Sequence, residues 1–187
     1  MAEVYTGTKF HTVFARREPP RDERIAELIH WCHHCGRSGI VGDTVGNLSF
    51  RTTGGFMINR AAGDLRSITP EEFVEVLRAD LANRELTVAG GHEPSSESMM
   101  HAAIYAARPD VNAVFHGHSQ RVLDQASSLR LPVTEHEQPY GTAELAAEIL
   151  KVLEWQKIVV MRNHGFVTVG RTMAEAGRWV EHLLARL

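Results

Sequence analysis

The chain has 187 residues, of which 43% are hydrophobic and 23% charged, with a formal net charge of −3 at pH 7. We treat residues 1–187 as a single domain with a sizeable core, in which residues 1–20 form an N-terminal arm. The charge gives no reason to expect nucleic acid or a membrane surface as a partner, and no apolar run approaches the roughly 20 residues of a membrane-spanning helix. Because "MAEVYTGTKF" has no apolar segment of the signal-peptide type, we expect a cytoplasmic protein.

The first predicted helix runs from about Asp22 to Cys35 and stops at Gly36, after an arm of irregular or extended chain. The sequence has two cysteines, Cys32 and Cys35, which form a C-x-x-C pair near the end of this helix. A structural zinc site needs a second pair of ligands, and the sequence offers no further cysteines to supply it. Because Cys32 continues the helical spacing of the apolar residues before it, we interpret it as a core residue.

A hairpin and a capped turn follow this helix. Residues 46–51 ("GNLSFR") and 55–59 ("GFMIN") have the composition of two strands joined by a short connection. Thr69 and Glu72 form a capping box with proline at the first helical position. The next segment, residues 73–81 ("FVEVLRADL"), fits either a helix or a strand, and its period does not decide between them.

Helices and strands alternate through the second half of the chain. Ser95 and Ser96 open a predicted helix that reaches Ala107, and a strand is predicted over 111–116. The remaining predicted elements are a helical stretch near 119–128, a helix from Thr142 to about Trp155, strands over 157–161 and 166–170, and a last helix capped by Thr172 and Glu175. This intermingling predicts an α/β layered domain.

The strand at 111–116 leads into "AVFHGHS", in which two histidines stand one residue apart. Side chains at positions i and i+2 of a strand point to the same side of the sheet, so His116 and His118 could hold one metal ion. A pair of hydrogen-bonded surface histidines is the alternative, and this fragment alone does not decide between the two interpretations.

Two further residues could complete such a site. His164 lies in "RNHG" after an apolar strand, although this pattern also fits a left-handed turn in which Asn163 and Gly165 set the conformation and His164 is incidental. Glu97 lies in the first turn of a predicted helix, where the helix dipole favours a carboxylate whatever its function. Three histidines and one carboxylate would form an imidazole-rich site of the catalytic zinc type.

Four blocks carry a resemblance to a known family: "GNLSFR", "EPSSE", "DVNAVFHGHS" and "MRNHGFVTVGRTMAEA", in this order over about residues 22–187. In these blocks the chain resembles the class II aldolase/adducin family, whose prototypes are fuculose- and rhamnulose-phosphate aldolases. The family's metal-binding histidines correspond to His116, His118 and His164. The resemblance implies that Glu97 also ligates the ion at rest and acts as acid/base in turnover. The positions that correspond to its substrate-binding residues are Asn47, Ser95 and Ser96.

The resemblance also implies a fold, a cofactor and an activity. The implied fold is an α/β three-layer αβα sandwich with a mostly antiparallel or mixed central sheet, assembled as a homotetramer with active sites between subunits. The implied activity is that of a divalent-metal-dependent lyase that cleaves or forms a carbon–carbon bond in a small hydroxy-carbonyl or sugar-phosphate substrate through a metal-bound enediolate. We expect Zn²⁺, with Mn²⁺, Co²⁺ or Ni²⁺ as alternatives, because imidazole suits several of these ions. The alternative functions are a metal-dependent decarboxylase or epimerase, and a non-catalytic adducin-like domain.

Two segments depart from the family pattern. Ala61-Ala62 falls where the aldolases have a Thr-Gly pair that helps to bind phosphate, and a methyl group cannot donate a hydrogen bond. Arg60 is the predicted substitute as an anion ligand, and a solvated arginine is the alternative. The tyrosine proton donor that reaches a neighbouring subunit's site is not at its usual place. The nearest positional match is His136, which we predict to be the proton donor, with Tyr140 as the second choice.

Overall fold

A mixed sheet of eight strands forms the centre of the molecule. The computed structural model describes residues 7–41 and 46–187. The strands within these residues are β1 His11–Arg16, β2 Asn47–Arg51, β3 Phe56–Asn59, β4 Phe73–Asp80, β5 Glu85–Ala89, β6 Ala113–Gly117, β7 Ile158–Met161 and β8 Gly165–Gly170. Their order in the sheet is β1-β5-β4-β3-β2-β6-β8-β7. Only β1 and β5 pair in parallel, so the sheet is mostly antiparallel.

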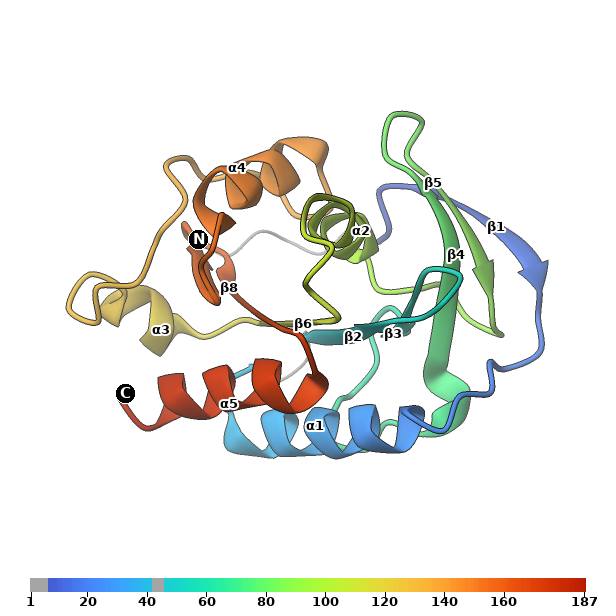
Figure 1. The fold of residues 1–187 in the computed structure, drawn as a ribbon, viewed down its shortest axis with the longest axis horizontal. Coiled ribbons are helices and arrows are strands. Elements are labelled where there is room, and N and C mark those ends of the chain that lie inside the picture. The colour runs from blue at the N-terminus through green and yellow to red at the C-terminus, as the bar shows by residue number, and fades with distance from the viewer. Residues whose placement is uncertain (1–6, 42–45) are drawn as a thin grey trace.

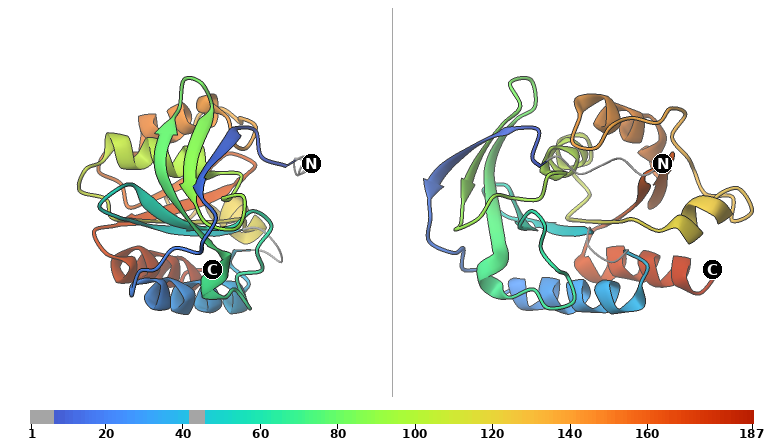
Figure 2. Two further views of the ribbon diagram at one scale, coloured as in Figure 1. Left: turned by 90° about the vertical axis from the view of Figure 1, so that its right-hand side faces the viewer. Right: turned by 180° about the vertical axis from the view of Figure 1, so that it is seen from behind.

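Helices cover both faces of this sheet. The described α-helices are α1 Ile25–Ser38, α2 Ser98–Ala107, α3 Gln120–Gln125, α4 Ala143–Leu153 and α5 Met173–Leu184. Helices α1 and α5 lie side by side on one face, and α2 and α4 lie on the other (Figures 1 and 2). Helix α3 joins the core beneath α1 and α5. The predicted fold class, a three-layer αβα sandwich with a mostly antiparallel sheet, is therefore confirmed. No helix in the described part of the chain is long and apolar enough to cross a membrane.

Alternation along the central strands separates two cores. In β2, Leu48 and Phe50 pack on the α1 and α5 side, whereas Ser49 contacts α2. In β6, Phe115 packs on the α1 side and Val114 on the α2 side. Because successive strand side chains point to opposite faces, His116, which follows Phe115 in β6, faces the layer that contains α2 and α4.

The structure decides the elements that the sequence left open and adds one. Residues 46–59 form the expected antiparallel hairpin of β2 and β3. The ambiguous segment after Glu72 is strand β4. The capping box at Thr69 caps the start of a single 3₁₀ turn, Pro70–Glu72. Strand β5 was not predicted from the sequence. It pairs with β1, so part of the predicted arm is an edge strand of the sheet.

Helix α1 runs past its predicted end at Gly36. It continues to Ser38, and Gly39 with φ 71° adopts the left-handed conformation that closes the helix. A Cβ at Gly36 would come within 2.9 Å of Arg66 Cγ and 3.2 Å of the Leu65 carbonyl carbon. Gly36 therefore allows a loop to pack closely on the helix, and the prediction that it ends the helix is wrong.

The contact between α1 and α5 gives a prediction about stability. A Cβ at Gly177 of α5 would overlap ring atoms of Trp31 in α1. Alanine is normally favoured over glycine inside a helix by about 1 kcal/mol. Here we expect Gly177→Ala to lower the free energy of unfolding by about 1–3 kcal/mol, because the core must shift to admit the methyl group.

Urea unfolding of the purified variants measures this effect. Ala147→Gly, at an exposed position inside α4, is the matched control and should lose only the helix-propensity difference of about 1 kcal/mol. A Gly177→Ala protein more stable than the wild type would contradict the close packing of α1 on α5.

Candidate metal centre

Four side chains from three segments of the chain converge at one end of the sheet: Glu97, His116, His118 and His164. One ligand atom of each lies within 4.8 Å of those of the others. His116 is in β6, and His118 follows directly after this strand. His164 lies in the turn between β7 and β8. Since Gly117 of β6 pairs with Phe166 of β8, this turn is brought beside the end of β6.

Both sequence interpretations of "RNHG" describe part of its structure. Asn163 has φ 56° and supplies the left-handed residue of the turn. A Cβ at Gly165 would collide with the Gly117 carbonyl and approach His116 Cε1 to 3.0 Å, so glycine is required there for close packing. His164 is not incidental to this turn, because its imidazole points at the Glu97 carboxylate.

The Glu97 carboxylate lies at the middle of the cluster. Its Oε2 is 2.8 Å from His116 Nε2 and 3.7 Å from His118 Nε2, and its Oε1 is 2.9 Å from His164 Nε2. Glu97 is the N-cap residue of α2, yet its side chain makes no capping hydrogen bond. A helix-terminus role therefore does not explain where the carboxylate points. The His118 side chain is 33% exposed, so solvent or a small molecule reaches the cluster from that side.

Neighbouring groups leave the ligand atoms in the forms that bind a metal. His116 Nδ1 is 2.8 Å from the Phe166 carbonyl oxygen, to which it donates, and Nε2 is then free to face the cluster. Burial raises the pKa of Glu97, but the charge of His116 and hydrogen bonds from the histidines outweigh it and hold this pKa well below its usual value. Burial lowers the pKa of His118, partly offset by its hydrogen bond to Glu97. A carboxylate together with three imidazoles, which bind a metal once their ligand nitrogens are deprotonated, is a donor set that suits a divalent ion.

The cluster passes a second test of its fit to a divalent ion. Glu97 Oε1 is buried, and although His164 Nε2 lies 2.9 Å from it, the two atoms do not have the geometry of a hydrogen bond. A buried carboxylate oxygen in this state is unfavourable without a cation close by. Three imidazole nitrogens match the three-histidine ligand set of catalytic zinc sites, which leaves a fourth position that the Glu97 carboxylate or a substrate could take. These four residues could therefore hold a divalent ion.

Comparison with known proteins places the chain in a family. The family described as Class II Aldolase and Adducin N-terminal domain matches residues 26–185. The chain belongs to the class II aldolase and adducin family. A 5-methylthioribulose-1-phosphate/5-deoxyribulose-1-phosphate aldolase of Escherichia coli O45:K1 (strain S88 / ExPEC) is 30% identical over 180 residues, which cover 82% of this chain and 79% of that protein.

Two further relatives show how the family varies. A methylthioribulose-1-phosphate dehydratase of Klebsiella pneumoniae (strain 342) is 25% identical over 189 residues, which cover 86% of this chain and 91% of that protein. The solved structure of an L-fuculose 1-phosphate aldolase superposes with a TM-score of 0.74 at 26% identity and covers 89% of this chain and 85% of that one. Relatives of this class II aldolase family member are thus named as aldolases and as dehydratases.

The residues predicted to bind substrate lie beside Glu97. Asn47 Nδ2 donates to Glu97 Oε2 at 2.9 Å, and Asn47 itself is buried. Ser95 Oγ accepts from the backbone N–H of Glu97 at 3.4 Å. Ser96 is partly exposed between these two residues in the chain. The structure brings Asn47 and Ser95 into contact with Glu97, and the contact of all three residues with a substrate remains a prediction.

Arg60 is engaged elsewhere. Its Nε donates to Glu72 Oε1 at 2.7 Å, and its Nη1 donates to the Ala61 carbonyl at 3.1 Å. Its backbone pairs with Pro94, next to the serines of the site. An anion bound at Arg60 would therefore compete with Glu72 for the guanidinium group.

The two predicted proton donors do not join the cluster of their own chain. The His136 side chain is 61% exposed, and its Nδ1 is 3.5 Å from Glu148 Oε2 of α4. The Tyr140 hydroxyl donates to the Gly7 carbonyl at 3.0 Å, and Lys9 Nζ lies 3.8 Å from the centre of its ring. The role predicted for His136 concerns a neighbouring subunit's site, so it stays a prediction.

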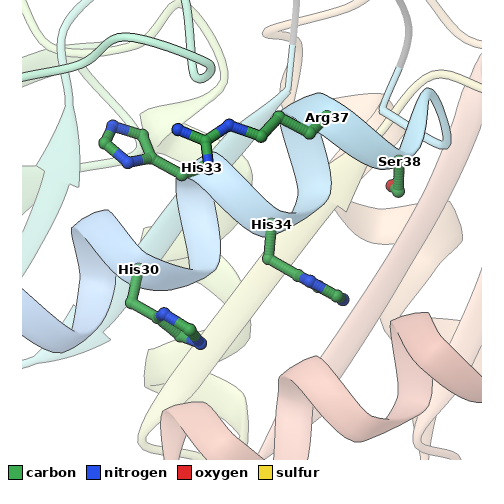
Figure 3. A pocket seen from close by; sticks show the side chains of 5 residues that line it. All are labelled: His30, His33, His34, Arg37 and Ser38. Atoms are coloured by element: carbon green, nitrogen blue, oxygen red, sulfur yellow. The ribbon is translucent and has the colours of Figure 1, made fainter.

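A second group of histidines lines a hollow on the outer side of α1, together with an arginine and a serine: His30, His33, His34, Arg37 and Ser38. Figure 3 shows the rings of His30 and His34 on one side of the helix, while His33 and Arg37 point to another. His34 Nε2 lies 3.4 Å from a carboxylate oxygen of Glu181 in α5. Among the residues described, only the Glu97 group has converging ligand atoms, so these histidines form no comparable centre.

Cys32, beside these histidines, is a core residue as predicted, and Cys35 is buried as well. Cys32 and Cys35 are free thiols that solvent does not reach. Burial raises the pKa of Cys32 well above its ordinary value and that of Cys35 to about 12. Thiols in this state are poor metal ligands, because the thiolate is the form that binds.

The sequence did not single out three buried polar residues behind Asn47: Ser49, His101 and Tyr105. Two spacings could have found them. Ser49 is two residues after Asn47 on the same strand, so both face the same layer. His101 and Tyr105 follow Glu97 at intervals of four residues, which places all three on one side of α2.

We predict that the purified protein binds about one divalent ion per chain, as a site with three imidazole ligands does. His118→Ala removes one ligand from the solvent side of the cluster and should abolish this binding while the fold remains. Metal analysis after dialysis against Zn²⁺ measures the effect, with circular dichroism as the check on folding. Cys32→Ser, in the core, should leave the metal content unchanged. Undiminished occupancy in His118→Ala would show that the ligands are wrongly assigned.

Proposed function

We propose that the protein is a divalent-metal-dependent lyase that cleaves a carbon–carbon bond in a small hydroxy-ketone, most simply a ketose 1-phosphate. The observation that carries this proposal is the buried carboxylate of Glu97 in contact with three imidazoles at a point that solvent reaches. The relatives support the substrate class, because methylthioribulose 1-phosphate stands in the names of the Escherichia coli aldolase and the Klebsiella pneumoniae dehydratase compared above. We further propose zinc as the resident ion and a homotetramer with sites between subunits.

The residues of the site suit the two proton transfers of such a cleavage. A divalent ion held by the cluster would act as a Lewis acid toward the hydroxyl and carbonyl oxygens of the substrate. Cleavage removes a proton from the hydroxyl on the carbon that leaves as an aldehyde, and adds a proton to the carbon next to the ketone. These two positions are on different carbons, so two groups are needed. We assign the proton transfer to the carbon next to the ketone to Glu97. During this step, Asn47 continues to hold Glu97 by its amide hydrogen bond.

The other transfer is assigned to His136 of the partner subunit. Its side chain is largely exposed, so it is able to reach a second chain, and Glu148 accepts a hydrogen bond from its backbone N–H at 3.1 Å. Tyr140 is the second choice, since its hydroxyl would first have to leave the Gly7 carbonyl. Asn47, Ser95 and Ser96 are proposed to contact the substrate.

Dehydration is the second candidate reaction. It is favoured by the dehydratase relative, which the chain matches over 91% of that protein's length. A dehydratase removes the proton from the carbon next to the ketone and expels the hydroxyl of the following carbon as water. The same end of the substrate is held, but a carbon–oxygen bond breaks. Decarboxylation and epimerisation remain alternatives on the same principle, and a non-catalytic domain is disfavoured by the complete ligand set.

A product assay tests the proposed reaction. The Zn²⁺-loaded protein is incubated with 5-deoxyribulose 1-phosphate, 5-methylthioribulose 1-phosphate and L-fuculose 1-phosphate, and the products are identified by mass spectrometry. An aldehyde and a three-carbon ketose phosphate are expected, whereas a product lighter than the substrate by one water identifies a dehydratase. Glu97→Gln should keep the fold and most of the metal but lower the rate by about 10²–10⁴-fold. Near-wild-type turnover of this variant would exclude Glu97 from proton transfer.

Subunit mixing tests the predicted proton donor. His136→Ala should lower kcat with metal still bound, and His11→Ala, at another exposed histidine, should not. Subunits that lack His136 and subunits that lack His118 should regain activity when unfolded and refolded together, because a hybrid site combines an intact metal centre with an intact donor. A fully active His136→Ala enzyme, or mixtures that recover nothing, would contradict this assignment.

A further inference from the structure

A continuous line of hydrogen bonds runs from the interior of the protein to the Glu97 carboxylate. Its contacts are Tyr105 Oη to Ser49 Oγ (2.7 Å), Ser49 Oγ to His101 Nδ1 (2.6 Å), His101 Nε2 to Asn47 Oδ1 (2.6 Å) and Asn47 Nδ2 to Glu97 Oε2 (2.9 Å). Each of these residues is at most 5% exposed. Polar groups are expensive to bury unless all are satisfied, so the donor and acceptor at each contact matter.

The charge at one end determines the direction of every hydrogen bond. An ionised carboxylate only accepts, so Asn47 must turn its Nδ2 toward Glu97 and its Oδ1 toward His101. His101 Nε2 must then carry a hydrogen and donate it to Oδ1. If the ring is neutral, His101 Nδ1 carries no hydrogen and accepts a hydrogen bond from the Ser49 hydroxyl. Ser49 in turn is free to accept from Tyr105.

The surroundings of His101 keep its ring neutral. Burial and, to a lesser extent, the charge of His116 lower the pKa of His101 to about 3, although Glu97 partly opposes them. Phe56 stacks on the ring with a centroid distance of 6.4 Å and an interplanar angle of 18°. His101 is thus a fixed neutral donor with one defined tautomer.

We propose that His101, supported by Ser49 and Tyr105, is a positioning residue that fixes the Asn47 amide and through it the orientation of the Glu97 carboxylate toward the metal ligands. This inference rests on the proposed function in one respect, the role of Glu97 at the metal. Without the donor at His101, Asn47 Oδ1 is buried without a hydrogen-bond partner, and the amide is no longer held in place against the Glu97 carboxylate. Partners of this kind typically change metal affinity by about 10–100-fold.

Binding of Co²⁺, which absorbs visible light according to its ligand geometry, tests the proposal without any assay of turnover. His101→Leu removes both ring nitrogens and should raise the Kd for Co²⁺ by about 10–100-fold and alter the absorption spectrum. His101→Gln should return both toward the wild type, because its terminal amide is able to donate to Asn47 Oδ1. Tyr105→Phe, which removes only the far hydroxyl, should change the Kd least.

A matched control separates positioning from a general loss of stability. Ile104→Ala removes buried apolar contacts from the same helix without touching the hydrogen-bonded line, so it should lower Tm but leave the Co²⁺ spectrum and Kd unchanged. A His101→Leu protein with wild-type Kd and spectrum, or an Ile104→Ala protein with the same loss of affinity as His101→Leu, would overturn the proposal.

The metal-free wild-type protein provides a measurement that does not depend on any variant folding. ¹⁵N-edited NMR of its histidine rings should show His101 as the neutral form with hydrogen on Nε2. Hydrogen on Nδ1 of His101 would reverse the direction of its hydrogen bonds to Ser49 and Asn47. This result would overturn the proposal, even if the protein proves to be a lyase. If instead the NMR and Co²⁺ results are as expected and no substrate is cleaved, the positioning role stands and the proposed reaction is wrong.

Discussion

The metal centre depends on a carboxylate that folding removes from water. Glu97 is 4% exposed, and an isolated charge at that depth would strongly destabilise the fold or become protonated. Imidazoles from three directions and an amide from β2 make the ionised form favourable instead. When the ring nitrogens lose the hydrogens that face Glu97, the same arrangement brings nitrogen lone pairs and a charged oxygen into a small space, where a divalent ion would replace those hydrogens. One electrostatic constraint therefore links the core, the ligand set and the chemistry.

The sheet satisfies this constraint by its register. Asn47 pairs with His116 across β2 and β6, so the amide and the imidazole lie side by side before any side-chain contact is formed. Antiparallel pairing of β6 with β8 places the turn that carries His164 at the same end. Helix α2 then needs only to begin at that point for Glu97 to meet them. Each ligand comes from a strand end or a helix start, where the backbone holds the side chain and solvent remains within reach.

The sequence predicted those parts of the molecule that local patterns determine. The two histidines of β6 share a face because strands alternate, and the hairpin and the helix caps at Thr142 and Thr172 follow from composition over a few residues. The spacing from Glu97 places His101 on the same side of α2, but its contact with Asn47 could not be predicted, because the two residues lie 54 positions apart and meet only when α2 packs on β2. Strand β1 was not predicted for the same reason, since its partner β5 is distant in the sequence. The prediction that α1 ends at Gly36 was wrong because glycine is favoured both by tight packing and by a helix end.

The positions that depart from the aldolase pattern lie outside the buried cluster. Ala62 is exposed and adopts φ 52°, so it keeps a backbone conformation that glycine adopts at less cost, while the neighbouring methyl group offers no hydrogen bond to a phosphate. His136 is on an exposed loop, and Arg60 is held by Glu72 at the surface. Under the proposed function, the buried centre would serve either reaction, because both place negative charge on the same oxygens of the substrate. The exposed groups that reach the far hydroxyl would then decide whether a carbon–carbon or a carbon–oxygen bond breaks. A constrained interior with a different set of exposed groups around it is therefore compatible with both names found among the relatives, aldolase and dehydratase.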